Sequence, residues 1–366
     1  MNNRYPVYKP SLDGNEKKYV MECLDSTWIS SKGEFIKKFE GGFADYLGVK
    51  YATSTTNGTT ALHLALLALG IKPGDEVIVP TFTYVASVNT IVYTGATPVF
   101  VDSLEDTWQM DPEDVKRKIT PKTKAIMAVH LYGQPCDLNA LGQIARSHGL
   151  LLVEDCAEAF GSKYDNKYVG TFGHAAAFSF FGNKTITTGE GGMVITNDQS
   201  IYQRAMHLKS QAVVSDREYW HDVIGYNYRM TNLCAAIGLA QLERADELVT
   251  RKRAIAGWYE EFLSGTGIVC PKDASNTVNT YWMYTILVQS PFVREQLRKY
   301  LSQQGIETRP TFYCAHTMPM YSEGSLHFPV AENLSARGIN LPSYPDLTKD
   351  DISIICKNII DGLVKG

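Results

Sequence analysis

The stretch EVIVPTFTYVASVNTIVYTGATPVFVD, residues 76–102, decides the fold class. Two short apolar runs, EVIVP and TPVFVD, flank a segment of helical character, which predicts a strand, a helix and a second strand. Further apolar runs follow at KAIMAVH (124–130) and LLLVED (150–155), with the helical DLNALGQIARSHG between them. This alternation predicts a largely parallel sheet with both faces covered by helices, and sites in such sheets lie at the carboxyl ends of the strands.

The pattern changes after a long amphipathic segment, residues 231–263, which opens at Thr231 or Asn232 as a candidate helix cap. The runs YWMYTILVQ, REQLRKYLSQQG and DISIICKNIIDGLV then indicate a smaller α+β unit. We therefore expect an α/β protein with two domains. The large domain, residues 1–250, has a mostly parallel mixed sheet flanked by helices, and the small C-terminal α+β domain spans residues 251–366.

Composition excludes several classes of function. The 366 residues carry a net charge of −4 (35 minus 39), so we expect no nucleic-acid partner. The longest apolar run, ALHLALLALGI, is shorter than the roughly 20 residues of a membrane-spanning helix. The N-terminus has no apolar leader, and seven scattered cysteines form no CxxC pair. These features predict a cytoplasmic protein without a membrane partner or a disulfide framework.

A single lysine stands out in SFFGNKTITTGEGGMVITND, residues 179–198, where Lys184 lies between an aromatic run and a glycine-rich loop. The segment matches neither the GxxxxGK[ST] phosphate loop nor the GxGxxG dinucleotide fingerprint. GxSxG, HExxH and ligand-spaced histidines are also missing, so we expect no metal. Taken alone, such a lysine is more often a solvated loop residue than a phosphate ligand or a covalent catalyst.

Two other segments change that interpretation. The strand-like LLLVED ends in Asp155, and STTNGTTALHLALLALG (54–70) places Gly58, Thr59 and Thr60 at the start of a helical run. A helix N-terminus offers amide donors and a positive dipole end, which suit a phosphate, although a turn or cap without a ligand has the same sequence. A phosphate cradle, an acid at a strand end and a lysine are the parts that hold pyridoxal phosphate.

The parts occur in the order found in fold-type I pyridoxal-phosphate aminotransferases, and the chain resembles the branch that aminates nucleotide-linked keto sugars. FSFFGNKTITTGEGGM resembles the segment of the cofactor lysine, and EDCAEAFGSKY the segment that faces the cofactor ring. PTFTYVASVNTIVYTGATPVFVD, GYNYRMTNLCAAIGLAQL and GIETRP match further blocks, so the resemblance covers nearly the whole chain. CLDSTWISSKGEFI, HDVIGYNYRMTN and HTMPMYSE resemble members that act on a GDP-linked keto sugar.

The resemblance implies a role for each candidate residue. Lys184 would be the catalytic residue that carries the cofactor, and Asp155 would pair with the pyridine nitrogen. Glu158 would lie beside the phenolic oxygen, where members more often have glutamine or histidine. The other expected cofactor contacts are Ser179, Gly58, Thr59 and Thr60 at the phosphate, Tyr84 on the ring, and Asn227 from the second subunit of a homodimer with shared active sites. The residues expected at the substrate are Trp28, Ser30 and Ser31 in an N-terminal loop, and Arg309 and His316 near the C-terminus. For Tyr84 and these five, a purely structural role stays open.

The implied reaction moves an amino group from glutamate to carbon 4 of GDP-4-keto-6-deoxymannose, for polysaccharide (O-antigen) synthesis. One alternative is an aminotransferase for a UDP- or dTDP-linked keto sugar. A second is a sugar 3-dehydratase relative, which carries histidine at the position of Lys184. A third is a non-catalytic binding protein of the same fold, which the presence of both Lys184 and Asp155 disfavours.

Overall fold

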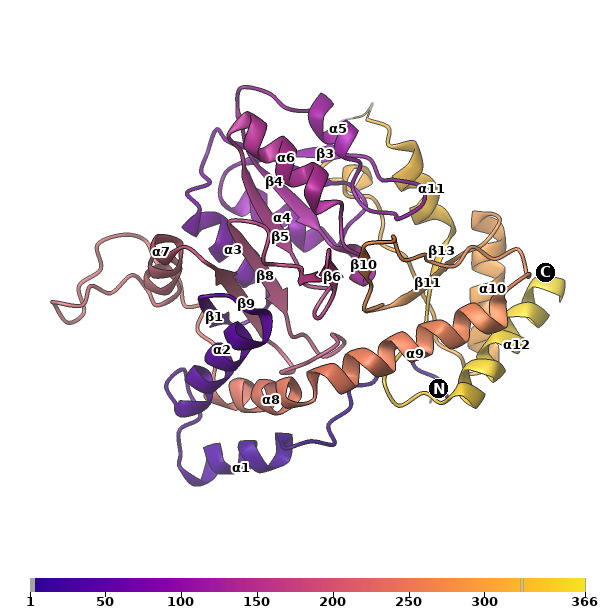
Figure 1. The fold of residues 1–366 in the computed structure, drawn as a ribbon, viewed down its shortest axis with the longest axis horizontal. Coiled ribbons are helices and arrows are strands. Elements are labelled where there is room, and N and C mark those ends of the chain that lie inside the picture. Colours follow the sequence, from indigo (N-terminus) through magenta and orange to yellow (C-terminus); the bar gives the residue numbers. More distant parts are fainter. Residues whose placement is uncertain (1–3, 323, 325, 366) are drawn as a thin grey trace.

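A computed structural model describes residues 4–322, 324 and 326–365 and contains a large seven-stranded sheet flanked by helices (Figure 1). The strands from β8 to β3 in the sheet are parallel neighbours, whereas β9 is antiparallel to both β8 and β1. The predicted mostly parallel mixed sheet is therefore confirmed. In sheet order the strands are β1 (Tyr51–Thr55), β9 (Gly192–Thr196), β8 (Ala175–Ser179), β5 (Leu151–Asp155), β4 (Thr123–Val129), β2 (Glu76–Pro80) and β3 (Thr97–Val101).

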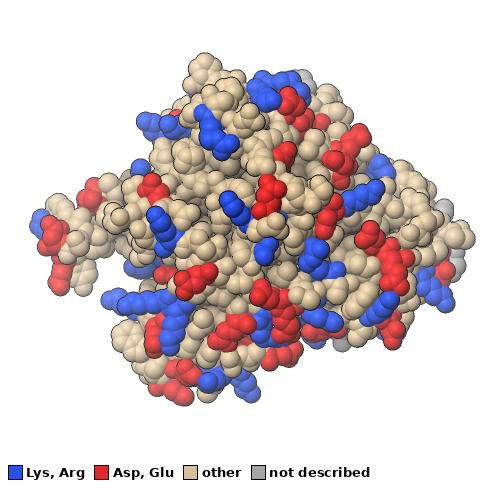
Figure 2. All heavy atoms as spheres, viewed as in Figure 1, with Lys and Arg blue, Asp and Glu red and all other residues tan. Residues whose placement is uncertain are grey.

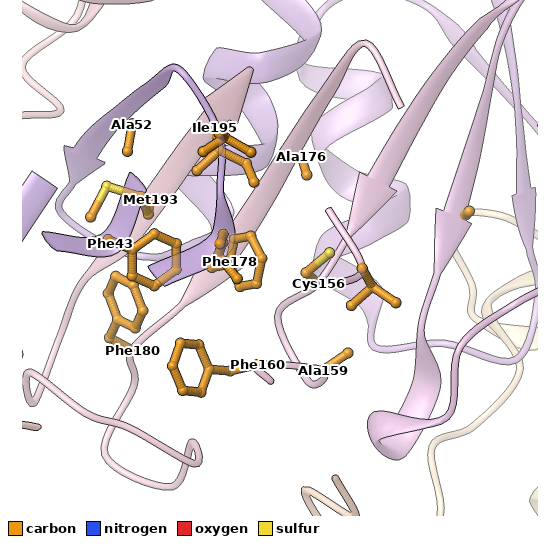
Figure 3. Close-up of a cluster of buried hydrophobic side chains, with 14 of the residues drawn as sticks. Phe43, Ala52, Cys156, Ala159, Phe160, Ala176, Phe178, Phe180, Met193 and Ile195 are labelled. Carbon is orange, nitrogen blue, oxygen red and sulfur yellow. The ribbon is translucent and has the colours of Figure 1, made fainter. Parts of the chain in front are cut away.

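Successive residues of these strands face two separate apolar cores. In β5, Leu152 belongs to one core and Val153 to the other, because side chains alternate across a strand. Figure 3 shows part of the first core, where Phe43 packs against Phe178 and Phe180 with ring centroids 5.1 and 5.5 Å apart. Burying each such ring contributes about 1.5–3 kcal/mol, so the sheet forms a rigid base for whatever lies at its edge.

Helices cover both faces of this sheet. The first core includes residues of α2 and α8, and the second includes residues of α3 and α4. The helices up to the middle of the chain are α1 (Glu16–Asp25), α2 (Glu34–Leu47), α3 (Gly58–Ala68), α4 (Val85–Tyr93), α5 (Pro112–Arg117), α6 (Leu138–His148) and α7 (Gln199–Lys209). A short 3-10 turn (Leu131–Gly133) follows β4.

The predicted helical segment 231–263 forms two helices, α8 (Asn232–Glu243) and α9 (Ala245–Leu263). Thr231 caps α8, because its hydroxyl accepts a hydrogen bond from the amide of Cys234 at 3.2 Å, so the predicted start is confirmed. The break lies at Arg244, whose backbone angles (φ −108°, ψ 12°) leave the helical region.

The C-terminal part of the chain has its own antiparallel sheet and core. The core gathers apolar residues from α9, α10 and α12. The elements are β11 (Tyr284–Leu287), β12 (Arg309–Pro310), β13 (Gly338–Leu341), α10 (Pro291–Gln303), α11 (Pro329–Arg337), α12 (Lys349–Lys365) and a 3-10 turn (Ala315–Thr317). A third small sheet joins β10 (Thr277–Val278), β6 (Lys163–Tyr164) and β7 (Lys167–Tyr168). The expected domain boundary near residue 250 falls inside α9, and the division into two domains stays a prediction.

The N-terminal segment lies against this C-terminal part. The amide of Tyr5 donates to the carbonyl of Gly305 at 3.0 Å, and the carbonyl of Tyr5 accepts from the amide of Glu307 at 2.9 Å. The ring of Tyr5 is buried in the third core beside Ile306. Residues some 300 positions apart are therefore joined by backbone hydrogen bonds.

The surface carries both signs of charge in close mixture. Figure 2 shows lysines and arginines interspersed with acidic residues over the visible face. Among the residues that the structure describes, none of the helices has the length and apolar character needed to cross a membrane.

Candidate active site

A cavity of about 390 Å³ opens where the parallel strands end. Its wall includes residues three to five positions beyond the ends of strands: Gly58 after β1, Tyr84 after β2, Glu158 after β5, and Lys184 after β8. The volume falls within the roughly 300–1,000 Å³ of small-molecule sites. The cavity therefore lies where an α/β sheet is expected to hold a ligand.

The side chain of Lys184 points at an aromatic ring. Its Nζ lies 3.8 Å from the centroid of the Trp282 indole, within the range of a cation–π contact. The backbone carbonyl of Lys184 accepts a hydrogen bond from the hydroxyl of Tyr8. Burial lowers the pKa of the Lys184 amine, while Glu158 and Asp155 oppose that shift. The amine is therefore closer to its neutral, reactive form than an exposed lysine.

Two carboxyl groups share the cavity with this lysine. Asp155 is buried and accepts hydrogen bonds from the Ser87 hydroxyl at 2.7 Å and the Ala157 amide at 3.0 Å. Burial nevertheless raises the pKa of Asp155, so a cationic partner in the cavity would stabilise the carboxylate. Burial also raises the pKa of Glu158, to about 7, against the lowering effect of Lys184.

Glu158 is held by a strained backbone. One of its oxygens accepts a hydrogen bond from the amide of Tyr132 at 2.8 Å. Tyr132 has a φ of 56°, a left-handed conformation that is costly for an aromatic residue and is compatible with a functional role for this turn.

The opposite end of the site is the N-terminus of α3. Asn57 caps this helix, and its side chain accepts the amide of Thr60 at 2.9 Å while the Thr60 hydroxyl accepts the Asn57 amide at 3.2 Å. Thr60 is thus engaged in the cap and does not line the cavity, whereas Gly58 and Thr59 do. A Cβ on Gly58 would lie 2.6 Å from the Cβ of Ser179, so only glycine lets the helix begin this close to β8.

This set of donors fits pyridoxal phosphate. The amides at the start of α3 and the hydroxyl of Ser179 suit a phosphate, and the raised pKa of Asp155 marks a carboxylate that gains from a protonated ring nitrogen. Tyr84, at the start of α4, exposes about half of its ring on the cavity wall (55%). The residues on this wall that would hold the group are Gly58, Thr59, Tyr84, Asp155, Glu158, Ser179 and Lys184.

The remaining candidates lie elsewhere in this chain. Arg309 lines a neighbouring cavity of about 560 Å³ and pairs with Glu307 at 2.5 Å. Trp28 and Ser31 line a separate cavity of about 890 Å³, and Ser30 is exposed beside them.

Two further candidates do not line the Lys184 cavity within this chain. His316 is buried between Thr81, 2.7 Å from its Nδ1, and Glu332, 3.2 Å from its Nε2, which gives the ring a structural contact on each side. Asn227 is exposed and pairs with Ser210 in an isolated bridge.

Sequence reasoning missed the aromatic and polar support of the lysine. Trp282 and Tyr8 contact Lys184, and Ser87 binds Asp155. The signal for Ser87 was its place in the helix that follows β2, at the same sheet edge. Trp282 lies in YWMYTILVQ, which indicates only a strand.

One cluster resembles a metal site. His130, Glu154 and Cys156 place ligand atoms within 4.8 Å of one another, all buried. However, the Nδ1 of His130 accepts the amide of Cys136 at 3.1 Å, and its Nε2 lies 3.1 Å from Glu154. Glu154 also accepts three backbone amides between residues 170 and 173 at 2.6–2.8 Å. His130 and Glu154 are thus already hydrogen-bonded to each other and to backbone amides, which fixes the end of β5 next to the cavity.

The chain belongs to the DegT/DnrJ/EryC1/StrS aminotransferase family, whose family model matches residues 10–360. It is 61% identical over 354 residues to the GDP-perosamine synthase of Escherichia coli O157:H7, covering 97% of each chain. It is 54% identical over 358 residues to the GDP-perosamine synthase of Vibrio cholerae, covering 97% of this chain and 98% of that one. A Streptococcus pneumoniae protein described as a sugar aminotransferase in its PLP form superimposes with a TM-score of 0.93 at 27% identity, over 100% of this chain and 99% of that one.

Proposed function

We propose that this protein is a pyridoxal-phosphate-dependent sugar-nucleotide aminotransferase that forms GDP-perosamine, with glutamate as the amino donor and GDP-4-keto-6-deoxymannose as the acceptor. The observation that carries the proposal is Lys184, which lies in a strand-end cavity with Asp155 and Glu158 and has a lowered amine pKa. Similarity over nearly the full length to two GDP-perosamine synthases supports the choice of sugar nucleotide.

The residues of this chain divide the work. Pyridoxal phosphate, when bound, supplies an electron sink for the bonds broken at the amino-bearing carbon. Gly58, Thr59 and Ser179 would bind its phosphate, and Asp155 would keep its ring nitrogen protonated. Lys184 would carry the cofactor and move the proton, because its amine loses a proton more readily than that of an exposed lysine.

Two alternatives follow from the same fold. An aminotransferase for a UDP- or dTDP-linked keto sugar would use the same residues around Lys184 and differ only in substrate contacts. A sugar 3-dehydratase relative or a non-catalytic binding protein is disfavoured, since Lys184 and Asp155 both lie on the cavity wall.

We further propose that the enzyme is a cytoplasmic homodimer whose sites are shared. The segment between α7 and α8 extends away from the body of the molecule (Figure 1) and exposes Tyr219 (91%) and Ile224 (85%). Exposed apolar side chains of this kind mark protein contacts. Asn227 is exposed near the end of this segment, and we expect it to reach the cavity of a second subunit. All seven cysteines are free, as is usual in a reducing compartment.

The experiment that tests the function incubates the purified protein and glutamate with GDP-, UDP- and dTDP-linked 4-keto-6-deoxy sugars in parallel. Mass spectrometry should find the aminated product only with the GDP sugar, together with 2-oxoglutarate. Amination of the UDP or dTDP sugar alone would select the alternative acceptor. No amination of any sugar by a cofactor-loaded protein would reject the proposed activity. The Lys184→Ala variant, which keeps the phosphate contacts, is the control for non-enzymatic transfer.

A further inference from the structure

Trp282 makes two different contacts to the segment of the catalytic lysine. Its indole Nε1–H donates a hydrogen bond to the carbonyl of Asn183 at 2.7 Å. The face of the same ring lies 3.8 Å from the Nζ of Lys184. The side chain is buried (4% exposed), so both contacts are made away from bulk water. One residue therefore binds the backbone before the lysine and covers its amine.

The position of Trp282 is itself fixed by the C-terminal part of the chain. Lys252 in α9 donates from its Nζ to the carbonyl of Trp282 at 2.9 Å, and also to the hydroxyl (3.0 Å) and the carbonyl of Ser343. The indole stacks on Tyr132 with centroids 6.2 Å apart and planes inclined by 9°. Lys252 is fully buried, and burial lowers its pKa to about 7. The buried amine of Lys252 donates to all three of these acceptors. Its hydrogen bonds therefore fix the backbone of Trp282 relative to Ser343.

We propose that Trp282 is a positioning residue that holds the Lys184 amine against its ring and stabilises the ammonium form. The proposal rests on the function proposed for Lys184. A cation is attracted to the face of an indole, and the attraction grows when water is excluded. Trp282 thereby reduces the fraction of Lys184 that is a neutral amine, the form that attacks a carbonyl carbon.

Other groups around Lys184 act on the same equilibrium. Asp155 and Glu158 favour the ammonium, while desolvation opposes it. Glu190 also lines the cavity, and Tyr8 binds the Lys184 carbonyl rather than the amine. The charged groups are the same in every variant of Trp282, and Trp282→Phe also keeps an apolar ring in this place, so the loss of the indole face can be told from the change in desolvation.

The test measures the pKa of Lys184 directly in the full-length, cofactor-free protein. Trace acetylation with acetic anhydride is followed over a range of pH, and the peptide that contains Lys184 is quantified by mass spectrometry. The midpoint of the labelling curve reports the pKa, whereas its plateau reports access to the reagent. The variants are Trp282→Leu, which removes the ring face and the N–H, and Trp282→Phe, which keeps a smaller face. Trp258→Leu is the matched control, because Trp258 also contacts a cation, Arg251, but in α9 away from the cavity.

Trp282→Leu should lower the midpoint by about one pKa unit, a tenfold rise in the neutral fraction at neutral pH. Trp282→Phe should lower it by less, and Trp258→Leu should leave it at the parental value. A parental midpoint in a folded Trp282→Leu variant overturns the proposal. If that variant does not fold, a parental midpoint in Trp282→Phe does so instead. Because the readout needs neither cofactor nor sugar, it separates failure of this inference from failure of the amination assay.

Discussion

Replacing Gly58 with alanine tests whether α3 must begin in close contact with Ser179. A Cβ at Gly58 would lie 2.6 Å from the Cβ and 2.9 Å from the Oγ of Ser179. Carbon atoms pack at about 3.5–4.0 Å, so the helix start and the end of β8 must separate by roughly 1 Å. Overpacking of this kind lowers the free energy of unfolding by about 1–3 kcal/mol, and the better helix propensity of alanine offsets up to about 1 kcal/mol of that loss. We expect a net loss of stability of about 1–2 kcal/mol.

The same chemical change has the opposite sign elsewhere in the chain. Gly257 lies in α9, and a Cβ built there meets nothing within 4 Å. Gly257→Ala should therefore raise the free energy of unfolding by about 0.5–1 kcal/mol, through helix propensity alone. This variant controls for the general effect of glycine-to-alanine replacement.

The assay compares urea unfolding of the two cofactor-free variants and then measures their affinity for pyridoxal phosphate by equilibrium dialysis. A displaced helix start moves its amides away from the phosphate, so Gly58→Ala should bind the cofactor about tenfold more weakly, a change of about 1.4 kcal/mol. Gly257→Ala should bind like the parent. If Gly58→Ala keeps both parental stability and parental affinity, the helix start is not the phosphate site.

Three further predictions concern the acids, the lysine and the subunit contact. Asp155→Asn should keep the cofactor bound but slow both half-reactions roughly tenfold to more than a hundredfold, since a charge-assisted hydrogen bond is lost; stopped-flow rates near the parental ones would contradict the assignment. In the folded protein the pKa of Glu158 is raised from 4.5 to about 7. The protonated carboxyl therefore contributes stability to the cofactor-free protein that is fully present below pH 4.5 and is lost as pH rises through 7. Urea midpoints should therefore fall over this window in the parent and less in Glu158→Gln, and equal slopes would refute the shift. Mixing inactive Lys184→Ala with inactive Asn227→Asp should restore part of the activity if sites are shared, because mixed dimers then hold one site without either defect; no recovery after proven subunit exchange would reject sharing.

The large sheet could be predicted because its central strands are buried on both faces. Such strands are continuous apolar runs, as in residues 76–102, and need no alternation to be recognised. The break between α8 and α9 could not be predicted, because Arg244 is itself a good helix former and its neighbours have no stop signal. Tertiary packing determines where such a break occurs, and the local amino-acid sequence does not indicate it.

Some residues of the candidate site could be predicted from the sequence, and others could not. Asp155 could be proposed from the sequence because it ends a predicted strand, and Gly58 because it opens a predicted helical run. Lys184 was proposed because its glycine-rich segment resembles that of the family. Trp282 reaches the cavity from almost 100 positions beyond Lys184, and only the folded chain brings it there. Tyr132 was equally hidden, because a positive φ at a tyrosine leaves no mark in the sequence.

The contact of the N-terminal segment has a consequence for how the protein is made. Tyr5 pairs with residues near Ile306, and Tyr8 binds the carbonyl of Lys184. A ribosome adds about 5–20 residues per second, so Tyr5 waits roughly 15–60 s until Ile306 is made, and Tyr8 waits roughly 9–35 s until Lys184 is made. Until then the start of the chain has no partner to bind. A tag or truncation that displaces Tyr5 and Tyr8 would therefore disturb the segment of Lys184, although it lies 176 positions further along the chain than Tyr8.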